Sequence, residues 1–264
     1  MKLKTIIPLL IACTFAMGCS DNDDKSPSPS DQWEVLNGTY LFGSLSDETK
    51  AVLPVIPVKS IDSMGQYPND IVLNHTHAFV VDSGNNTIHR IALDTLAVEK
   101  DFIDLGQNVG PYAAYADDEA LYIVCNVTPQ LVKVDLASKS QSILLTADHL
   151  IGGTAVVKMD QAIIVADSEY NYTDASQTEG KLIVITNDNQ IITHKTATPN
   201  PTFISAIQSG GQQYLVSSNS DIIQYDENWN PTPPSQSCVQ LWTIDDLTNE
   251  ADPAVKTHCE TNSS

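Results

Sequence analysis

Short apolar runs separated by polar turns dominate the chain, and five of the runs share one pattern. In each, a short strand and a tight turn precede a strongly apolar strand that ends in two small or polar residues. The five runs cover residues 40–44, 79–83, 122–126, 164–168 and 214–218. Their matching positions, Phe42, Val81, Val124, Ala166 and Val216, are 39, 43, 42 and 50 residues apart. This is the period of a four-stranded β-propeller blade.

The segments around these runs fit the same unit. Asn37-Gly38 is a hairpin signal, and polar turns at 117–119, 159–161 and 209–211 occupy its place in later units. We expect third strands at 87–94, 131–136, 182–185 and 222–226, and outer strands at 102–105, 143–145, 191–193 and 239–242. An apolar second strand suits a position covered on both faces by neighbouring blades. The sequence therefore predicts an all-β fold, a β-propeller of five units, or of six if residues after Asp245 contribute another blade.

The first residues form a targeting segment rather than part of the fold. A basic start, Lys2 and Lys4, precedes an apolar run too short to span a bilayer, then Gly18-Cys19 and an acidic stretch. This resembles a bacterial lipoprotein signal, which implies lipidation of Cys19. Cys13 is the alternative lipid site, and an ordinary secretory signal is the alternative kind of segment.

Three regions follow from this interpretation. Residues 1–18 are the signal peptide, 19–31 are a disordered Ser/Pro/Asp tether, and 32–264 are a single propeller domain with a C-terminal tail. Ser20 follows the lipidated cysteine where inner-membrane lipoproteins carry aspartate, so the resemblance implies an outer-membrane lipoprotein facing the periplasm or the cell surface.

Charge narrows the range of partners. The chain has 33 acidic and 13 basic residues, a net charge of −20. Nucleic-acid binding needs basic patches, and anionic head groups would repel such a surface, so we expect neither as a partner. A protein or a small molecule, besides the lipid anchor, remains the expected partner.

The cysteines suggest one disulfide. In an oxidising envelope Cys238 and Cys259 would tie the C-terminal tail to the last strand, closing a loop of about 20 residues worth about 3 kcal/mol. Cys125 lies in an apolar run and reads as a buried small hydrophobe.

One segment resembles a known family. Pro68-Asn69-Asp70-Ile71, residues 81–88 and Leu121-Tyr122-Ile123-Val124-Cys125-Asn126 are similar to YncE-like propellers with the YVTN repeat, which are close in style to NHL repeats. The resemblance covers about residues 66–135. It implies a fold and not a function, because propellers host many functions. Many relatives have seven units, whereas this chain has five.

Catalytic signatures such as Gly-x-Ser-x-Gly, His-Glu-x-x-His and the P-loop are absent from the sequence. His75 and His77 could face one way on a strand, but a metal would need a third ligand that the sequence does not identify. A solvated turn explains this pair as well.

Polar residues at the strand ends are the candidate binding set. In a propeller, loops after second strands and before first strands share one face, around the channel mouth. This topology would bring together the following residues: Asn69, Asp70, Tyr112, Asn126, Asp82 and Asp167. They could bind a small ligand, or calcium through convergent carboxylates, or simply stabilise turns.

An insertion at residues 169–180 lengthens one turn at this mouth and adds Tyr170 and Tyr172. Long loops on rigid scaffolds often carry function, although a tolerated surface insertion is the alternative. Residues 231–234 we place in a stiff connector between third and fourth strands, on the opposite face.

Two functions are consistent with the sequence. The first is a non-enzymatic binding or scaffold lipoprotein without a cofactor. The alternative is a metal-dependent enzyme of the lactonase or lyase type with its site at the channel mouth, supported by the Asp and Asn set alone.

Overall fold

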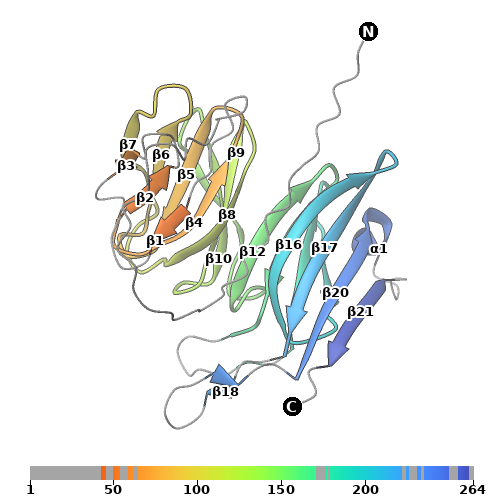
Figure 1. The fold of residues 1–264 in the computed structure, drawn as a ribbon. Coiled ribbons are helices and arrows are strands. Elements are labelled where there is room, and N and C mark those ends of the chain that lie inside the picture. The colour runs from red at the N-terminus through yellow and green to blue at the C-terminus, as the bar shows by residue number, and fades with distance from the viewer. Residues whose placement is uncertain are drawn as a thin grey trace, which may run out of the picture.

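Four antiparallel sheets of four strands form the body of the protein (Figure 1). The computed structural model describes residues 43–45, 50–53, 59–61, 65–170, 177, 179–221, 224–225, 231–232, 235–249 and 255–261. We number the blades by the five sequence repeats, so the four complete sheets are blades 2 to 5.

The complete blades have these strands. Blade 2 is β4 (Pro68–Leu73), β5 (His77–Asp82), β6 (Thr87–Ala92) and β7 (Val98–Asp104). Blade 3 is β8 (Pro111–Ala116), β9 (Ala120–Cys125), β10 (Gln130–Asp135) and β11 (Gln141–Leu145). Blade 4 is β12 (Gly153–Met159), β13 (Ala162–Asp167), β14 (Lys181–Thr186) and β15 (Ile191–Lys195). Blade 5 is β16 (Asn200–Ser209), β17 (Gln212–Ser220), β20 (Gln236–Thr243) and β21 (Lys256–Thr261).

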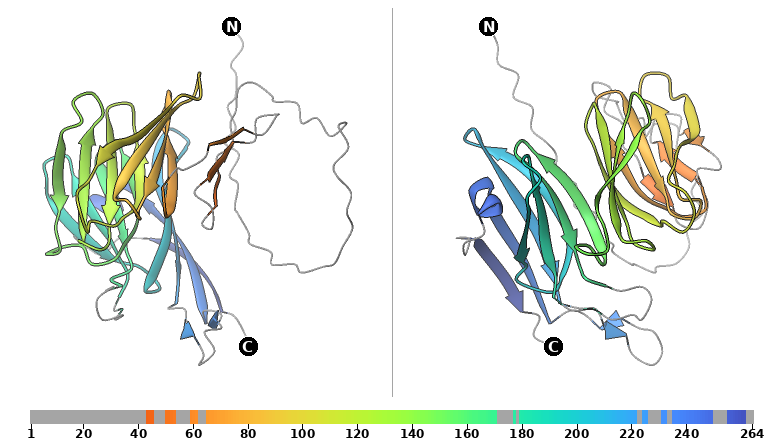
Figure 2. Two further views of the ribbon diagram at one scale, coloured as in Figure 1. Left: turned by 90° about the vertical axis from the view of Figure 1, so that its left-hand side faces the viewer. Right: turned by 180° about the vertical axis from the view of Figure 1, so that it is seen from behind.

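A fifth, three-stranded sheet belongs to the first repeat, and we call it blade 1. It comprises β1 (Gly43–Leu45), β2 (Lys50–Leu53) and β3 (Lys59–Ile61), with β2 in the middle. The predicted strand at 40–44 overlaps β1 at its end, while residues 40–42 lie outside the described residues. Figure 2 (left) shows this sheet beside β4.

The core lies between the blades, as the apolar second strands predict. Every residue of β9 is buried, and so are five of the six residues of β5 and of β13. Because strand residues point alternately to the two faces, such a strand needs apolar cover on both sides. Three clusters supply it: Phe79 with Ile123 between blades 2 and 3, Tyr122 with Val165 between blades 3 and 4, and Ile164 with Trp242 between blades 4 and 5.

Each complete blade carries a β-bulge at the same place in its first strand. The register shifts between Pro68 and Asp70 in β4, and at the equivalent points of β8, β12 and β16. The bulged residues are Asn69, Tyr112, Thr154 and Thr202. A bulge turns one extra side chain out of the ladder, so this position can contact the next blade.

Blade 5 departs from the strand assignment that the sequence predicts. Residues 222–226 were expected as its third strand, but β20 pairs with β17 and β21 pairs with β20. Gln224–Tyr225 (β18) instead pairs with Pro231–Thr232 (β19) in a small separate sheet. The third strand is β20 because Cys238, Gln240 and Trp242 alternate into the core.

Three further corrections follow from that register. The loop around residues 231–234 joins the second strand to the third, so it leaves the sheet at the same end as the 169–180 insertion, not at the opposite end. Residues after Asp245 form part of α1 (Ile244–Thr248) and the outer strand β21, so the described ones complete blade 5 rather than begin a sixth. The repeat position matching Val81 is Ser218 rather than Val216, because the nine-residue β17 is longer than the other second strands.

The short helix closes the end of the interface between blades 4 and 5. Thr243 caps it: its hydroxyl accepts the Asp246 amide, while the Asp246 carboxylate accepts the Thr243 amide. Leu247 is fully buried, and its carbonyl lies 2.9 Å from Nε2 of His194. In the described part of the chain no helix is long and apolar enough to cross a membrane.

The structure contains the disulfide between Cys238 and Cys259, which face each other on β20 and β21 with Cα atoms 4.1 Å apart. Cys125 is a free thiol, fully buried at the end of β9. Burial raises the pKa of the Cys125 thiol to about 12. The thiol is therefore neutral and unreactive at neutral pH in the folded protein.

This arrangement predicts a two-stage alkylation pattern. Iodoacetamide should label none of these three cysteines in the folded protein, and Cys125 alone after denaturation without a reductant. Peptide mass spectrometry reads out the labels. Labelling of Cys238 and Cys259 in the unreduced, denatured sample would contradict the disulfide.

Candidate functional site

The predicted binding residues that the structure describes lie at one end of the sheets, and most of them tie strands together. Asn69 Nδ2 donates to the Pro111 carbonyl at 3.3 Å, and Asp70 Oδ2 accepts the Ala114 amide at 3.0 Å. Both bonds cross from β4 to β8, so these two residues join blade 2 to blade 3. Burial raises the pKa of Asp70, and the Ala114 and Ile71 amides oppose that shift.

Asp82 is fully buried at the end of β5 and is saturated with donors. Its carboxylate accepts the Tyr67 amide at 3.0 Å, the Gly84 amide at 3.1 Å and the Asn85 side chain at 2.8 Å. A Cβ on Gly65, whose φ is +109°, would lie 2.1 Å from the Asp82 carboxylate. The carboxylate therefore holds the segment before β4 against the end of β5.

Asp167 plays the same role in blade 4. It is fully buried and accepts the amides of Ile151, Gly152 and Glu169 at 3.0, 2.8 and 2.8 Å. Lys181 Nζ lies 3.6 Å from Asp167 and 2.6 Å from Glu169. The turn-stabilising interpretation of the two aspartates is thus realised in the structure, and their oxygens point at backbone amides.

The other predicted residues at this end are placed as follows. Tyr112 is 40% exposed at the bulge of β8, and Asn126 is buried after β9 with its amide bonded to the Gly110 carbonyl. Tyr170 is half-buried, and a Cβ on Gly152 would lie 2.5 Å from its carbonyl oxygen. Tyr172 lies outside the described residues. Ligand contact by this set stays a prediction.

His75 and His77 do not share a site. His75 Nδ1 lies 2.7 Å from Asp118 on the neighbouring blade, while His77 Nδ1 lies 2.8 Å from the Thr76 hydroxyl. Burial lowers the pKa of His77, and the positive charge of Arg90 lowers it further. Among the described residues, no three His, Cys, Asp or Glu side chains gather in a way that could hold a metal ion.

Two pockets lie at the opposite end of the sheets, where the one-to-two hairpins turn. One of about 350 Å³ lies between the hairpins of blades 2 and 3, around His75 and Asp118. The other, of about 280 Å³, lies between blades 3 and 4.

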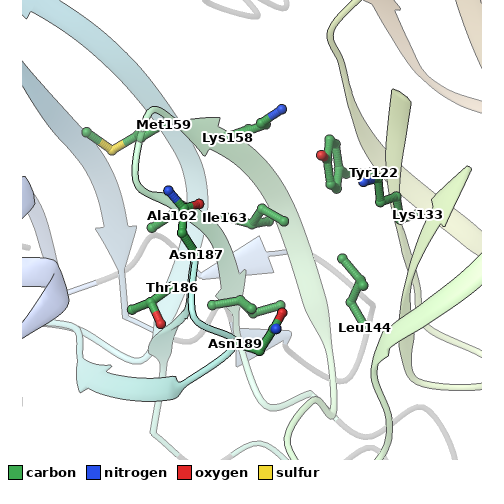
Figure 3. A pocket seen from close by; sticks show the side chains of 11 residues that line it. Tyr122, Lys133, Leu144, Lys158, Met159, Ala162, Ile163, Thr186, Asn187 and Asn189 are labelled. Atoms are coloured by element: carbon green, nitrogen blue, oxygen red, sulfur yellow. The ribbon is translucent and has the colours of Figure 1, made fainter. Parts of the chain in front are cut away.

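The second pocket is where the core between blades 3 and 4 opens to solvent (Figure 3). Tyr122, Lys133 and Leu144 form one wall, from blade 3, and blade 4 supplies the other. The blade 4 residues are Lys158, Met159, Ala162, Ile163, Ile185, Thr186, Asn187 and Asn189. Apolar walls with amide, hydroxyl and ammonium groups at the rim are typical of small-ligand sites. We call this the Tyr122 pocket.

Two lysines flank the ring of Tyr122 in this pocket. Lys158 Nζ is 5.5 Å from the ring centroid and Lys133 Nζ is 5.8 Å from it, both within cation–π range. Tyr122 itself is 2% exposed. The Tyr122 ring therefore lies within cation–π distance of two ammonium groups at the opening of the Tyr122 pocket.

The two lysines differ in how they are neutralised. Lys158 pairs with Asp117 at 2.5 Å, and that hydrogen bond raises the pKa of Lys158. Burial raises the pKa of Asp117, but the bonds from Lys158 and from the Glu119 and Ala120 amides outweigh it, so the net shift is downward. Lys133 is half-buried and forms no ion pair with any residue that the structure describes.

Blade 2 shows what Lys133 lacks. Arg90 holds the same register position as Lys133, opposite Phe79 as Lys133 is opposite Tyr122. On the next strand Arg90 faces Glu99 and bonds to it at 2.6 Å, whereas Lys133 faces Ser142. Blade 3 therefore keeps the cation but has no carboxylate across from it. The aligned repeats of the sequence contain this signal, although they did not lead us to predict a role for Lys133.

Comparisons with solved structures show the fold. A chain in the crystal structure of a nidogen/laminin complex matches with a TM-score of 0.54 and 12% identity, over 83% of this chain and 77% of that chain. The β-propeller domain of Myceliophteria thermophila Cps50 (Swd1) matches with a TM-score of 0.57 and 12% identity, over 85% and 70%. No protein-family model and no curated protein matches the sequence. The chain is thus a β-propeller of four-stranded blades.

The buried aspartates give a stability prediction. Replacing Asp167 by Ala leaves three backbone amides and Lys181 without their carboxylate partner. Hydrogen bonds to a charged group contribute about 1.5–3 kcal/mol each. We therefore expect the free energy of unfolding, measured in urea, to fall by at least about 3 kcal/mol. The exposed Asp94→Ala is the matched control and should change stability by about 0.5 kcal/mol or less.

A functional role for Asp167 predicts the opposite. Carboxylates kept for a ligand usually cost stability, so their removal leaves the unfolding free energy unchanged or raises it. An unchanged or raised unfolding free energy would favour the interpretation of Asp167 as a ligand-binding residue.

Proposed function

We propose that this chain is an envelope-anchored binding lipoprotein, related to YncE-like propellers, whose propeller holds a small acidic ligand in the Tyr122 pocket. The observation that carries the ligand class is the ammonium of Lys133, which forms no ion pair among the described residues. In a chain with 33 acidic and 13 basic residues, this half-buried cation acts on Asp135 only beyond ion-pair distance, which leaves a place for a closer anionic partner.

A carboxylate or phosphate group supplies that partner. It would take the place that Glu99 has beside Arg90, while the side-chain amide of Asn189 offers hydrogen bonds to the rest of the ligand. Asn187 already donates to the Asp160 carbonyl, and the Thr186 hydroxyl already accepts the Gln190 amide. The apolar walls from Leu144, Ile163 and Ile185 favour a ligand with a carbon skeleton over a bare ion. A volume of about 280 Å³ suits a small molecule.

The usual catalytic signatures are absent from the sequence, so we favour binding over catalysis. One structural neighbour is a chain from a complex of two proteins, and this also supports a scaffold or interaction role. The lipid on Cys19 and the polar stretch at 19–31 would hold the domain at the outer membrane and away from its surface.

The binding proposal predicts the effects of two substitutions. Titrations by calorimetry with citrate, galacturonate and inorganic phosphate should detect binding of at least one to the native protein. Lys133→Met should weaken it about tenfold or more, since a bond to a charged group contributes about 1.5–3 kcal/mol. Ser142→Glu should abolish it by restoring the carboxylate found in blade 2.

The matched control is Lys256→Met, which removes the same charge from an exposed position on β21. Its affinity should stay within about twofold of the native value. Equal losses of affinity in Lys133→Met and Lys256→Met would mean that the net charge of the protein, rather than the pocket, governs binding. Failure of all three acids to bind would contradict the acidic-ligand proposal.

The anchor makes its own prediction. Mass spectrometry of the mature protein from the envelope fraction should find a diacylglyceryl group on Cys19 as the first residue. A lipid on Cys13, or a free N-terminus elsewhere, would refute the anchor while leaving the pocket unaffected.

A further inference from the structure

Blade 5 exposes apolar side chains on the sheet face that a following blade would cover. Phe203 and Ile207 on the innermost strand β16 are 52% and 38% exposed, and Val239 on β20 is 47% exposed. The register puts Phe203, Ser218 and Val239 in one row, and Ile207 and Tyr214 in another row of the same face. Together these residues make what we call the open face of blade 5.

The equivalent face of blade 4 is covered. Ala155, Ala166 and Leu182 form the row that matches Phe203, Ser218 and Val239. Blade 5 buries Ala166 and Leu182 completely, within the cluster that includes Trp242 and Leu215. Within the described residues, the repeat therefore stops at this exposed apolar face. Its composition is that of a face covered by another blade rather than of a solvent-exposed surface.

A hydrogen bond found between two of the three pairs of adjacent complete blades has no counterpart at the same place. In those two pairs the bulge residue of one blade donates to the carbonyl just before the bulge of the next blade's inner strand, Asn69 to Pro111 and Thr154 to Pro201. Thr154 also bonds back to Ala166 in its own blade, and Thr202 makes only the corresponding bond, to Ser218. Among the described residues Thr202 has no acceptor in a following blade.

Blade 1, the first blade in the chain, is at the opposite end of the row of blades from blade 5. Its β1 contacts β4, as the second strands β5, β9 and β13 contact the first strands of the blades that follow them. One edge of β1 pairs with β2, in the way that second strands pair with third strands. Within the described residues nothing pairs with its other edge, where a first strand belongs.

We infer that residues 32–45 of this chain cover the open face of blade 5 and complete a five-bladed ring. Residues 32–36 would supply the missing first strand, followed by the Asn37-Gly38 hairpin and a second strand running into β1. Both runs are apolar, with Trp33, Val35, Leu41 and Phe42, which is the composition that the exposed Phe203, Ile207 and Val239 need opposite them. The segment is attached to a sheet that already contacts β4.

Site-specific photo-crosslinking tests this occupant. Phe203 is replaced by p-benzoylphenylalanine in the full chain expressed in bacterial cells, and Ile207 in a second variant in case the first folds poorly. After irradiation, tryptic digestion and mass spectrometry should find a crosslink to the peptide from Ser26 to Lys50 of the same chain. The matched control is Ile143, 58% exposed on the outer strand β11, which should give no crosslink to that peptide.

Each other outcome contradicts the inference. A crosslinked dimer on a denaturing gel would assign the open face to a second copy, and a crosslink to another protein would assign it to a partner. No crosslink to residues 26–50 from either position would mean that the face is open. None of these outcomes bears on the acidic-ligand proposal, because the Tyr122 pocket lies between blades 3 and 4.

Discussion

Burial of the second strands β5, β9 and β13 on both of their faces is the constraint on which the rest of this structure depends. Strands such as β9 are buried at every position, so a single sheet cannot satisfy them. Only a neighbouring sheet on each side can, and this turns a repeat of about 40 residues into a row of blades. The candidate binding groups then lie near the ends of the strands, where the interblade cores give way to solvent.

The two ends use their polar groups differently. At the end with the bulges, Asp82 and Asp167 accept backbone amides, and Asn69 and Asp70 connect adjacent inner strands. These side chains are occupied with holding the blades. At the other end, Arg90 and Lys133 are the register partners of Phe79 and Tyr122, and Lys133 lacks the facing carboxylate that its equivalent Arg90 has in Glu99. A small change in one repeat therefore separates a structural ion pair from a candidate binding position.

The fold could be predicted from the sequence because the signals behind it are local. The apolar second strands, their spacing and the Cys238–Cys259 pairing all appear in the structure. Blade 5 was misassigned because an apolar run at 222–225 resembles a strand as well as β20 does. Cross-strand register and the burial of Trp242 decide between them, and neither is visible in one sequence.

The candidate site was harder to predict, for a related reason. Asp82 and Asp167 stand out in the sequence, and whether a carboxylate faces a ligand or its own backbone depends on turn geometry. Lys133 does not stand out, since its meaning lies in the comparison with Arg90 and in the replacement of Glu99 by Ser142 across the next strand. Such a comparison needs the strand register to be known first.

Solvent access to Phe203 tests the central claim that every blade face is covered. Hydroxyl-radical footprinting of the full chain compares phenylalanines of equal intrinsic reactivity, with Phe79 and Phe102, 1% and 3% exposed, as internal references. Coverage by the N-terminal segment predicts that Phe203 is oxidised at a rate within about twofold of those two residues. Oxidation of Phe203 many times faster than of Phe79 would show that the face of blade 5 is open, and would contradict the claim.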